Sequence, residues 1–265
     1  FSITDISSKI VNRNPSGPFT TSTLQQTASS RLGFGASRTM QIAQKLYQGI
    51  EIEGETIGLI TYMRTDGTNL SKDAVSSFRN YIEKEIGKEY LPENILNYSG
   101  KKAKNAQEAH EAIRPTDIIR TPQSVKKYLS PDQNKLYDLI WSRALSSQME
   151  SAKFDRNTIT ITSDNNDTIC KASGSVLKFD GFLKIYNTPN KDDDEGILPV
   201  MSKGLVNIEV LLDEEHFTQP PPRYSEASLV KKLEELGIGR PSTYASIIST
   251  IANRGYAEIL NKRFF

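Results

Sequence analysis

Residues 154–163, FDRNTITITS, mark the point where the hydrophobic pattern of the chain changes. Apolar and polar residues alternate here with a period of two, and Thr and Ile dominate, as they do in half-buried β-strands. A similar composition continues in TICKASGSVLKF at 168–179 and in GLVNIEVLLDEEHF at 204–217, with Asn, Asp, Gly and Pro between the stretches. The sequence therefore predicts a β-rich segment that begins near residue 153.

The opening residues 1–11, FSITDISSKIV, alternate in the same way. We expect this stretch to pair with the β-rich segment from the far side of the chain. The residues between the two would then form an insertion within the sheet domain.

Helical patterns fill most of that insertion, residues 20–149. Each predicted helix has a Ser or Thr before it, and all but the last are closed by a Gly. The stretches are TSTLQQTASSRLGFG at 21–35, SRTMQIAQKLYQG at 37–49, SKDAVSSFRNYIEKEIG at 71–87 and SPDQNKLYDLIWSRAL at 130–145. In the last, Ser130 is the expected N-cap, Pro131 the first helical residue and Gln133 the partner in a capping box. After a proline-rich stretch, two more short helices are predicted within 225–237 and 240–256.

The composition indicates what kind of protein this is, but it does not indicate a function. The chain has 265 residues, 37% of them hydrophobic and 25% charged, which is typical of a globular protein. No apolar run approaches the roughly 20 residues that a membrane span needs, so we expect no membrane insertion. Cys170 is the single cysteine, which excludes an internal disulfide and a cysteine-based zinc cluster. The chain starts at Phe1 without a methionine, and we expect it to be an excised piece of a longer protein.

Net charge leaves nucleic acid open as a partner. The formal charge is +1, but a polyanion responds to a local basic patch and not to the total. The run NKDDDEG at 190–196 is expected to be a solvated acidic loop.

The stretch GLITYMRTDGTNLS at 58–71 carries the first candidate site. If its apolar opening is a strand, Tyr62 and Arg64 lie on one face, about 6 to 7 Å apart. A fixed cation favours a phenolate and stabilises charge that develops on a phosphate under attack. Thr65 opens the polar run that follows. The alternative is a strand-end tyrosine packed on the core, with the arginine extended into solvent.

A second polar cluster lies in NAQEAHEAIRPT at 105–116. If this segment is helical, His110, Glu111 and Arg114 lie on adjoining faces before Pro115 ends the helix. They would offer a proton carrier and a phosphate clamp. The alternative for His110 is an ordinary surface histidine.

The third cluster lies in GIGRPSTYASIISTIANRGY at 237–256. Arg240 comes just before a predicted helix whose first turn holds Ser242 and Thr243, so a guanidinium, hydroxyls and free amides converge where an anion would bind. Arg254 falls near the end of this helix, where a cation is favourable in any case. The alternative is a helix-turn-helix scaffold with a well-capped second helix.

Taken together, these stretches resemble type IA DNA topoisomerases, most closely the bacterial topoisomerase I branch. The matching blocks follow one another in the family's order and cover essentially the whole chain; they are PFTTSTLQQTASSRLGFG, GLITYMRTDGTNLS, QEAHEAIRPT, LIWSRALSSQM and PPPRYSEASLVKKLEELGIGRPSTYASIISTIANRGY. Met63 between Tyr62 and Arg64 favours this branch, and Gly67 departs from the serine more usual in the family.

The resemblance implies a multidomain fold of helices and strands. Residues 1–17 and 150–222 would form a β-rich arch, with a helical domain carrying the active-site tyrosine, 18–149, inserted between them. Residues 223–265 would be part of a second helical domain.

The resemblance also implies an activity. The enzyme would relax negatively supercoiled DNA without ATP, through a 5′-phosphotyrosyl intermediate, strand passage and religation. Tyr62 would be the nucleophile, Arg64 would assist at the phosphate and His110 would lie near the active site. Residues expected to contact DNA are Thr65, Glu111, Arg114, Arg240, Ser242, Thr243 and Arg254.

The expected partners follow from the same resemblance. The substrate would be single-stranded or underwound DNA in the bacterial cytoplasm, at the nucleoid. The cofactor Mg²⁺ would be bound by a Toprim domain for which this chain has no candidate, so we expect no metal ligands here and no activity without that domain. The alternative function is a non-catalytic single-stranded nucleic-acid-binding module, in which Tyr62 stacks on a base.

Overall fold

The computed structural model describes residues 1–98, 110–187, 196–207, 210, 212 and 214–265. The chain forms two compact units. One consists of Phe1–Pro15 and Glu150–Pro220, and the other of Ser16–Met149 and Pro221–Phe265. Within the described ranges, no helix is both long and apolar enough to cross a membrane.

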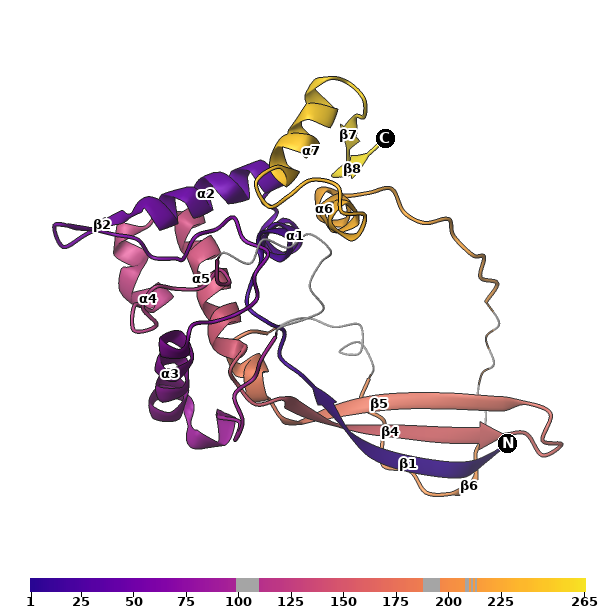
Figure 1. The fold of residues 1–265 in the computed structure, drawn as a ribbon. Helices are drawn as coiled ribbons and strands as arrows, with labels where there is room; N and C mark the ends of the chain where they lie inside the picture. Colours follow the sequence, from indigo (N-terminus) through magenta and orange to yellow (C-terminus); the bar gives the residue numbers. More distant parts are fainter. Residues whose placement is uncertain (99–109, 188–195, 208–209, 211, 213) are drawn as a thin grey trace. The chain divides into compact units, whose positions relative to one another are not determined.

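The first unit is built on an antiparallel sheet with the strand order β5-β4-β1-β6. Its strands are β1 (Ser2–Arg13), β4 (Ala152–Thr162), β5 (Ile169–Phe179) and β6 (Gly204–Leu205). The 3₁₀ turn η4 (Gly181–Lys184) follows β5 in the chain. Figure 1 shows the three long strands side by side.

The register of this sheet confirms the pairing predicted for the two distant stretches. β1 pairs with β4 from Ser2 opposite Thr162 to Arg13 opposite Ala152. The third predicted stretch is shorter than expected, because only Gly204–Leu205 of its described residues is strand. The acidic run at 190–196 lies outside the described residues except for Gly196.

The second unit is mainly helical. Its helices are α1 (Thr21–Leu32), α2 (Ala36–Gln48), α3 (Lys72–Tyr81), the π-helix η1 (Ile82–Ile86), the 3₁₀ turns η2 (Lys88–Tyr90) and η3 (Lys126–Tyr128), α4 (Pro122–Val125), α5 (Pro131–Ser146), α6 (Glu226–Glu235) and α7 (Tyr244–Asn253). This unit also contains two small hairpins. One pairs β2 (Ile50–Ile52) with β3 (Glu55–Ile57), and the other pairs β7 (Ile259–Leu260) with β8 (Arg263–Phe264). The mixed fold of helices and strands is thus as predicted.

Caps fix the helix ends where the sequence predicted them. The Ser130 hydroxyl accepts a hydrogen bond from the backbone N–H of Gln133, and the Gln133 side-chain oxygen accepts one from the backbone N–H of Ser130, which completes the capping box of α5. Gly33 ends α1 in the left-handed conformation, with φ of 68°.

Residues 221–265 pack on the first two helices of the same unit (Figure 1), with α6 on α1 and α7 on α2. The apolar contact joins the start of α2 to α6, α7 and β8; its buried residues are Ala36, Val230, Leu233, Tyr244, Ile248 and Phe264. The separate helical domain predicted for 223–265 stays a prediction.

Two carboxylates add polar contacts to this packing. The N-cap of α2 is Gly35, which has no side chain to cap the helix, and Glu226 Oε2 accepts a hydrogen bond from the backbone N–H of Ala36 at 2.7 Å in its place. Ser22 Oγ donates to Glu234 Oε2 at 2.7 Å.

Candidate active site

Tyr62 lies in an irregular segment, not at the end of a strand as predicted. β3 ends at Ile57, and of the residues that follow only Ile60 forms an isolated bridge, to Pro115. Ile60 and Met63 are both buried, whereas Arg64 is exposed and Tyr62 half-buried. The predicted alternation of faces is therefore wrong. Backbone irregularity leaves Tyr62 partly exposed between two buried anchors.

The residue before Tyr62 fixes the segment on one side. Thr61 donates its backbone N–H to Arg114 O at 2.9 Å and its hydroxyl to Ala112 O at 2.7 Å. The same hydroxyl accepts from the backbone N–H of Arg114 at 3.0 Å. These bonds tie the tyrosine segment to residues 112–114.

The start of α1 fixes the segment on the other side. Thr21 is fully buried, and its hydroxyl lies 2.7 Å from Met63 O and 3.0 Å from Thr65 O. It also accepts from the backbone N–H of Thr65 at 2.8 Å, while the N–H of Thr21 donates to Thr65 O at 2.8 Å. Tyr62 and Arg64 are thus held from both ends by hydrogen bonds, which are buried at Thr21 and partly buried at Thr61. We call Thr21 and Thr61 the threonine clamp.

Two aromatic rings flank Tyr62. The ring of Tyr47, on α2, meets it edge-on with centroids 5.5 Å apart, and the ring of His110 lies at 4.8 Å with the planes tilted by 54°. His110 itself is exposed. Among the described residues, the Tyr62 hydroxyl makes no hydrogen bond, including to Arg64 or His110. The predicted proximity of Tyr62 and His110 is confirmed, but as ring contact.

The segment with His110 is extended where it is described, so the helix predicted over 105–116 is wrong for residues 110–116. Ile113 bridges Phe19 in an antiparallel pair. Residues 99–109 lie outside the described part of the chain. Helical spacing therefore does not bring His110, Glu111 and Arg114 together.

Glu111 and Arg114 are joined instead by a two-pronged ion pair. Arg114 Nε donates to Glu111 Oε2 at 2.9 Å and Nη2 to Oε1 at 2.7 Å. Glu111 Oε2 also accepts from the backbone N–H of Ser71, the N-cap of α3. Both side chains thus hold the loop before α3, and their predicted DNA contacts stay predictions.

Gly67 lies against the backbone of His110. A Cβ added at Gly67 would collide with the His110 carbonyl oxygen, and Thr65 Oγ1 lies 3.4 Å from that same oxygen. The absence of a side chain at Gly67 lets these two loops approach closely.

The start of α7 differs from the predicted anion site. The helix begins at Tyr244, so Ser242 lies before its first turn. The amides of Thr243 and Tyr244 both donate to Arg240 O, at 2.8 and 3.2 Å. The Thr243 hydroxyl accepts from the N–H of Arg240 at 2.8 Å. These amides are therefore not free for an anion.

The side chains of this third cluster are nevertheless accessible. Arg240, Ser242 and Arg254 are exposed, and Arg254 is the C-cap of α7. Arg240 Nη1 donates to Gly239 O at 2.7 Å. Roles for these residues and for Thr243 in DNA contact stay predictions.

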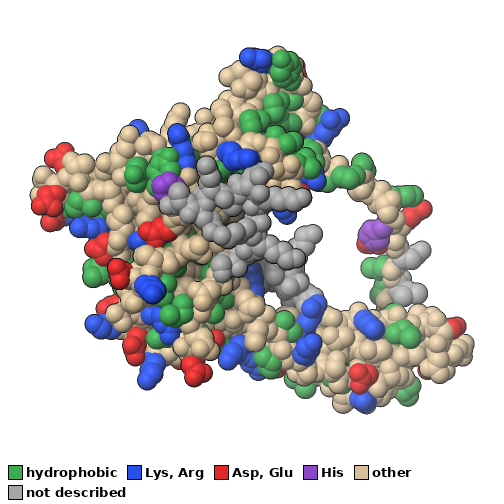
Figure 2. All heavy atoms as spheres, viewed as in Figure 1, with side chains coloured by type: hydrophobic (Ala, Val, Ile, Leu, Met, Phe, Trp, Pro, Cys, Tyr) green, Lys and Arg blue, Asp and Glu red, His purple; other side chains and the backbone are tan. Residues whose placement is uncertain are grey.

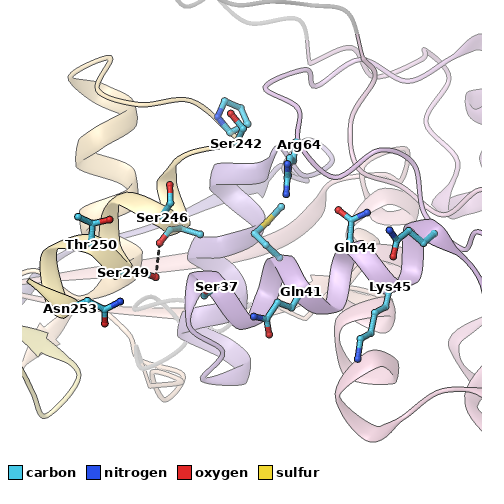
Figure 3. A pocket seen from close by; sticks show the side chains of 14 residues that line it. Ser37, Gln41, Gln44, Lys45, Arg64, Ser242, Ser246, Ser249, Thr250 and Asn253 are labelled. Carbon is cyan, nitrogen blue, oxygen red and sulfur yellow. Dashed lines mark hydrogen bonds between the residues drawn. The ribbon is translucent and has the colours of Figure 1, made fainter.

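A groove of about 680 Å³ connects the first and third clusters within this unit. It is lined by the α2 face from Ser37 to Gln48, by Arg64, and by the α7 side from Pro241 to Asn253. We call it the α2–α7 groove (Figure 3). Within the described part of the chain, Arg64 makes no hydrogen bond or ion pair.

Charge alone does not mark the site. Figure 2 shows Lys and Arg side chains interspersed with Asp and Glu on the visible face. Among the described residues, no group of three or more His, Cys, Asp or Glu side chains is arranged to hold a metal ion. The described residues therefore offer no acidic cluster for Mg²⁺.

Sequence reasoning missed Tyr47 and Thr21. Tyr47 belongs to a regular helical pattern, and no local signal showed that its ring meets Tyr62. Thr21 follows the N-cap Thr20, and its position at the start of a helical pattern gave no sign of the bonds to Met63 and Thr65. Both act through contacts distant in sequence.

Comparison with known proteins gives one consistent result. A family model described as DNA topoisomerase matches residues 1–265. DNA topoisomerase 1 of Rickettsia typhi is 52% identical over 100% of this chain and 34% of its own length. The Salmonella typhimurium protein of the same name is 48% identical over 100% of this chain and 29% of its own length. The chain thus spans about a third of the curated relatives that it matches.

A solved structure agrees with this result. Full-length topoisomerase I from Thermotoga maritima matches with a TM-score of 0.83 and 38% identity, over 99% of this chain and 42% of that one. Both the sequence and the fold match along almost the whole chain. From these matches, together with the segment that holds Tyr62, we conclude that the chain belongs to the DNA topoisomerase family and is related to the bacterial DNA topoisomerase 1 proteins.

Proposed function

We propose that this chain is the nucleophile-bearing part of a type IA topoisomerase. The oxygen of Tyr62 attacks a phosphodiester of single-stranded or underwound DNA. A new O–P bond forms, the O3′–P bond breaks, and the phenolic proton leaves to solvent while the 3′ oxygen takes one up. Because one phosphate ester replaces another, the strand can be resealed after passage of a second strand without ATP.

The observation that carries this proposal is the holding of Tyr62. Its backbone is fixed by the threonine clamp, its ring contacts the rings of Tyr47 and His110, and the hydroxyl makes no bond within the described residues. A reacting group held in one geometry loses less entropy on the way to the transition state. A tyrosine with a purely structural role would more often donate its hydroxyl to the protein, as Tyr98 does to Ser147 O.

The neighbouring side chains have separate roles in this proposal. Arg64 is exposed and lines the α2–α7 groove, so its guanidinium can stabilise the charge on the phosphate that is attacked. His110 lies at the ring of Tyr62 on the exposed side. Glu111, Arg114, Arg240, Ser242, Thr243 and Arg254 remain the proposed DNA contacts. The contact predicted for Thr65 does not fit the structure, because Thr65 is only 3% exposed and its hydroxyl accepts from the backbone N–H of Gly67.

Other parts of the enzyme are also proposed. A Toprim domain would hold Mg²⁺, and this chain would be inactive without it. The full enzyme would relax negatively supercoiled DNA in the bacterial cytoplasm, at the nucleoid. In this proposal residues 1–17 with 150–222 form the arch, and the helical parts are 18–149 and 223–265.

The experiment mixes the chain with a Toprim domain, Mg²⁺ and a single-stranded oligonucleotide. A 5′-phosphotyrosyl bond retains the 3′ part of the strand, so a label at the 3′ end should stay on the protein after denaturation and a 5′ label should not. Tyr62→Phe should remove the adduct. Tyr47→Phe keeps a ring beside Tyr62 and should retain it.

Two results would contradict the proposal. If the wild-type chain binds the oligonucleotide but forms no adduct, the non-catalytic binding module is the better description. If Tyr62→Phe still forms the adduct, another residue is the nucleophile.

A further inference from the structure

A second cavity lies in the helical unit and takes no part in the proposed reaction. It has a volume of about 640 Å³ and lies between one side of α3 with η1 and the loop 117–121 that precedes α4. We call it the α3 pocket. It shares no lining residue with the α2–α7 groove and contains none of the proposed catalytic or DNA-contacting residues. Its volume falls within the range of about 300 to 1,000 Å³ that is typical of ligand sites.

The helical wall of this pocket presents one stripe of side chains. Residues three and four positions apart lie on the same face of a helix. The stripe therefore runs along one side of α3 and continues into η1; its members are Ser77, Asn80, Tyr81, Lys84 and Glu85.

The last turn of this wall has an unusual backbone. The N–H of Gly87 donates to Ile82 O at 2.9 Å, which is the i to i+5 bond of a π-helix. Lys84 and Glu85 lie within this turn. Turns of this kind are rare and occur frequently at functional sites. The backbone therefore marks the same place as the cavity.

The opposite wall is a loop that the protein holds in place. The indole Nε1 of the buried Trp141 donates to Ile118 O at 3.0 Å, and Asp117 Oδ1 accepts from the N–H of Ile119 at 3.0 Å. Although this loop is fixed, the side chain of Ile119 is 74% exposed. A large apolar side chain is thus held in solvent at the edge of the pocket.

Tyr81 joins the pocket to the core of the unit. It is half-buried, and its ring meets that of Trp141 edge-on, with centroids 5.7 Å apart. Burial raises the pKa of the Tyr81 hydroxyl, and the negative charge of Glu85 raises that pKa further. An aromatic ring and a carboxylate are therefore close neighbours in this pocket.

The lining favours a cation that has an apolar stem. Glu85 lines the helical wall and Asp117 the loop wall, so each wall carries a carboxylate. A cation is attracted by carboxylates and also by the face of a phenol ring such as that of Tyr81. Ile118 and Ile119 supply apolar surface for an alkyl stem. The same carboxylates repel a polyanion, so this pocket is not a DNA site.

Two cations of the protein lie near these carboxylates, but neither closes the pocket. Arg120 Nε lies 3.7 Å from Asp117 Oδ2 in a partly exposed ion pair, which stabilises little. Lys84 is exposed and makes no hydrogen bond or ion pair within the described ranges. Its flexible stem can carry the ammonium group into solvent when a ligand enters.

We propose that the α3 pocket binds an alkylammonium group, that is, a protonated primary amine on an aliphatic stem. Glu85 and Asp117 bind the ammonium group beside the Tyr81 ring, and the stem packs on Ile118 and Ile119. This chemistry has two sources, a free aliphatic diamine or the lysine side chain of a partner protein. The inference goes beyond the proposed function and does not depend on it.

Trp141 provides a direct readout of binding. It is the single tryptophan of the chain, its indole N–H donates to Ile118 O, and its ring contacts Tyr81. In an isotope-labelled chain its one indole N–H resonance should therefore shift as the pocket fills. We expect n-butylammonium chloride, titrated at constant ionic strength, to give a saturable shift. n-Butanol has the same stem without the charge and should give none.

Neighbouring charges should have opposite effects on the affinity for n-butylammonium. Glu85→Gln and Asp117→Asn should each weaken binding about twofold to fivefold. Lys84→Ala should strengthen binding, because it removes a like charge from the pocket. Glu83→Gln and Lys88→Ala are matched controls, since both residues are exposed and close by in the chain but do not line the pocket. They should leave the affinity unchanged.

Two further probes distinguish the sources of the ligand. Tighter binding of diaminobutane than of an end-blocked peptide with one lysine supports a free diamine. Tighter binding of the peptide supports a partner protein. The same peptide with its lysine acetylated carries no charge and should not bind.

Two results would overturn the proposal. The first is the lack of a saturable shift with n-butylammonium in the folded wild-type chain. The second is an equal loss of affinity in Glu85→Gln and Glu83→Gln, which would indicate general attraction to an acidic surface. Circular dichroism checks that each variant is folded.

This proposal and the proposed function fail separately. Variants of the α3 pocket should form the DNA adduct normally, because none of its lining residues has a role in that reaction. Tyr62→Phe should in turn leave the binding of n-butylammonium unchanged.

Discussion

Tyr62 owes its position to residues distant in sequence. Thr21 lies 42 residues from Met63, whose carbonyl it binds, and Thr61 lies 51 residues from Ala112. A buried hydrogen bond such as that of Thr21 is costly to leave half-made, because the remaining partner stays desolvated. The geometry around Tyr62 therefore depends on both ends of the threonine clamp.

Removing one hydroxyl should loosen the segment. Thr21→Val keeps the shape of the side chain but leaves Met63 O without this donor and the N–H of Thr65 without this acceptor. We expect the free energy of unfolding to fall by about 1 to 3 kcal/mol and adduct formation to slow, with oligonucleotide affinity within about twofold of wild type. Stability is measured by urea denaturation. The matched control is Thr27→Val on α1, whose hydroxyl makes no bond among the described residues; equal effects in both variants would remove the special role of Thr21.

Arg64 should affect the reaction more than binding. Its proposed interaction grows as charge develops on the phosphate, so Arg64→Ala should lower the rate of adduct formation by more than it weakens DNA binding. Rates come from single-turnover assays and affinities from anisotropy. If Arg64→Ala lowers the rate and the affinity by the same factor, Arg64 contributes to DNA binding and not specifically to the reaction.

At the scale of elements, α1 contains a buried amide that satisfies neither of its polar atoms. Gln25 is 1% exposed, and neither Nε2 nor Oε1 has a hydrogen-bond partner among the described residues. An unpaired buried polar group destabilises the fold by about 1 to 3 kcal/mol. The tight burial of α1 therefore leaves one amide desolvated and without a partner among the described residues, which lowers the stability of the fold.

Replacing this amide by a thioether of similar length should stabilise the chain. Gln25→Met should raise the free energy of unfolding by about 1 to 2 kcal/mol. Gln148→Met serves as the comparison variant, because Gln148 Nε2 donates to Leu96 O at 2.9 Å. Loss of this hydrogen bond should lower the free energy of unfolding. Thermal unfolding distinguishes the two, and a destabilised Gln25→Met would mean that the amide has a partner in solution.

Elements with local signals were predictable, and the loops between them were not. The capping box of α5 and the glycine end of α1 follow from residues within four positions of the helix ends. The pairing of β1 with β4 followed from alternation alone. The segments 58–71 and 110–116 lack such local determinants, and long-range hydrogen bonds override their apparent strand and helix patterns.

Around Tyr62, the sequence predicted one contact and missed the others. Tyr62 and His110 are brought together, as expected. Glu111 and Arg114 bind each other, and the amides before α7 bind Arg240. A sequence shows which groups are available, but not which of them are already satisfied by one another.

At the scale of the whole molecule, buried and half-buried phenols make stability depend on alkaline pH. Burial raises the pKa of Tyr98 to about 12, against a smaller opposing effect of Arg143. Burial also raises the pKa of Tyr137, Tyr81 and Tyr244. In the unfolded chain these groups ionise near pH 10.

The sign of the effect follows from proton binding. Between about pH 10 and pH 12 the folded state holds the Tyr98 proton and the unfolded state has lost it, so stability falls as pH rises through this window. Below about pH 10 the contribution is fully present. Tyr98→Phe should reduce the slope by up to about 1.4 kcal/mol per pH unit. Urea denaturation between pH 9 and pH 12 measures it, with Tyr128→Phe as control because its hydroxyl bonds an exposed glutamate; an unchanged slope in Tyr98→Phe would contradict the prediction.

The capping of α2 by Glu226 has a consequence for biosynthesis. The carboxylate that completes the first turn of α2 is 190 residues further along the chain than Ala36. A ribosome must therefore synthesise α6 before α2 gains this cap, and until then the start of α2 tends to fray. Since Tyr47 on α2 contacts the ring of Tyr62, the surroundings of that ring are complete only after α6 has been synthesised.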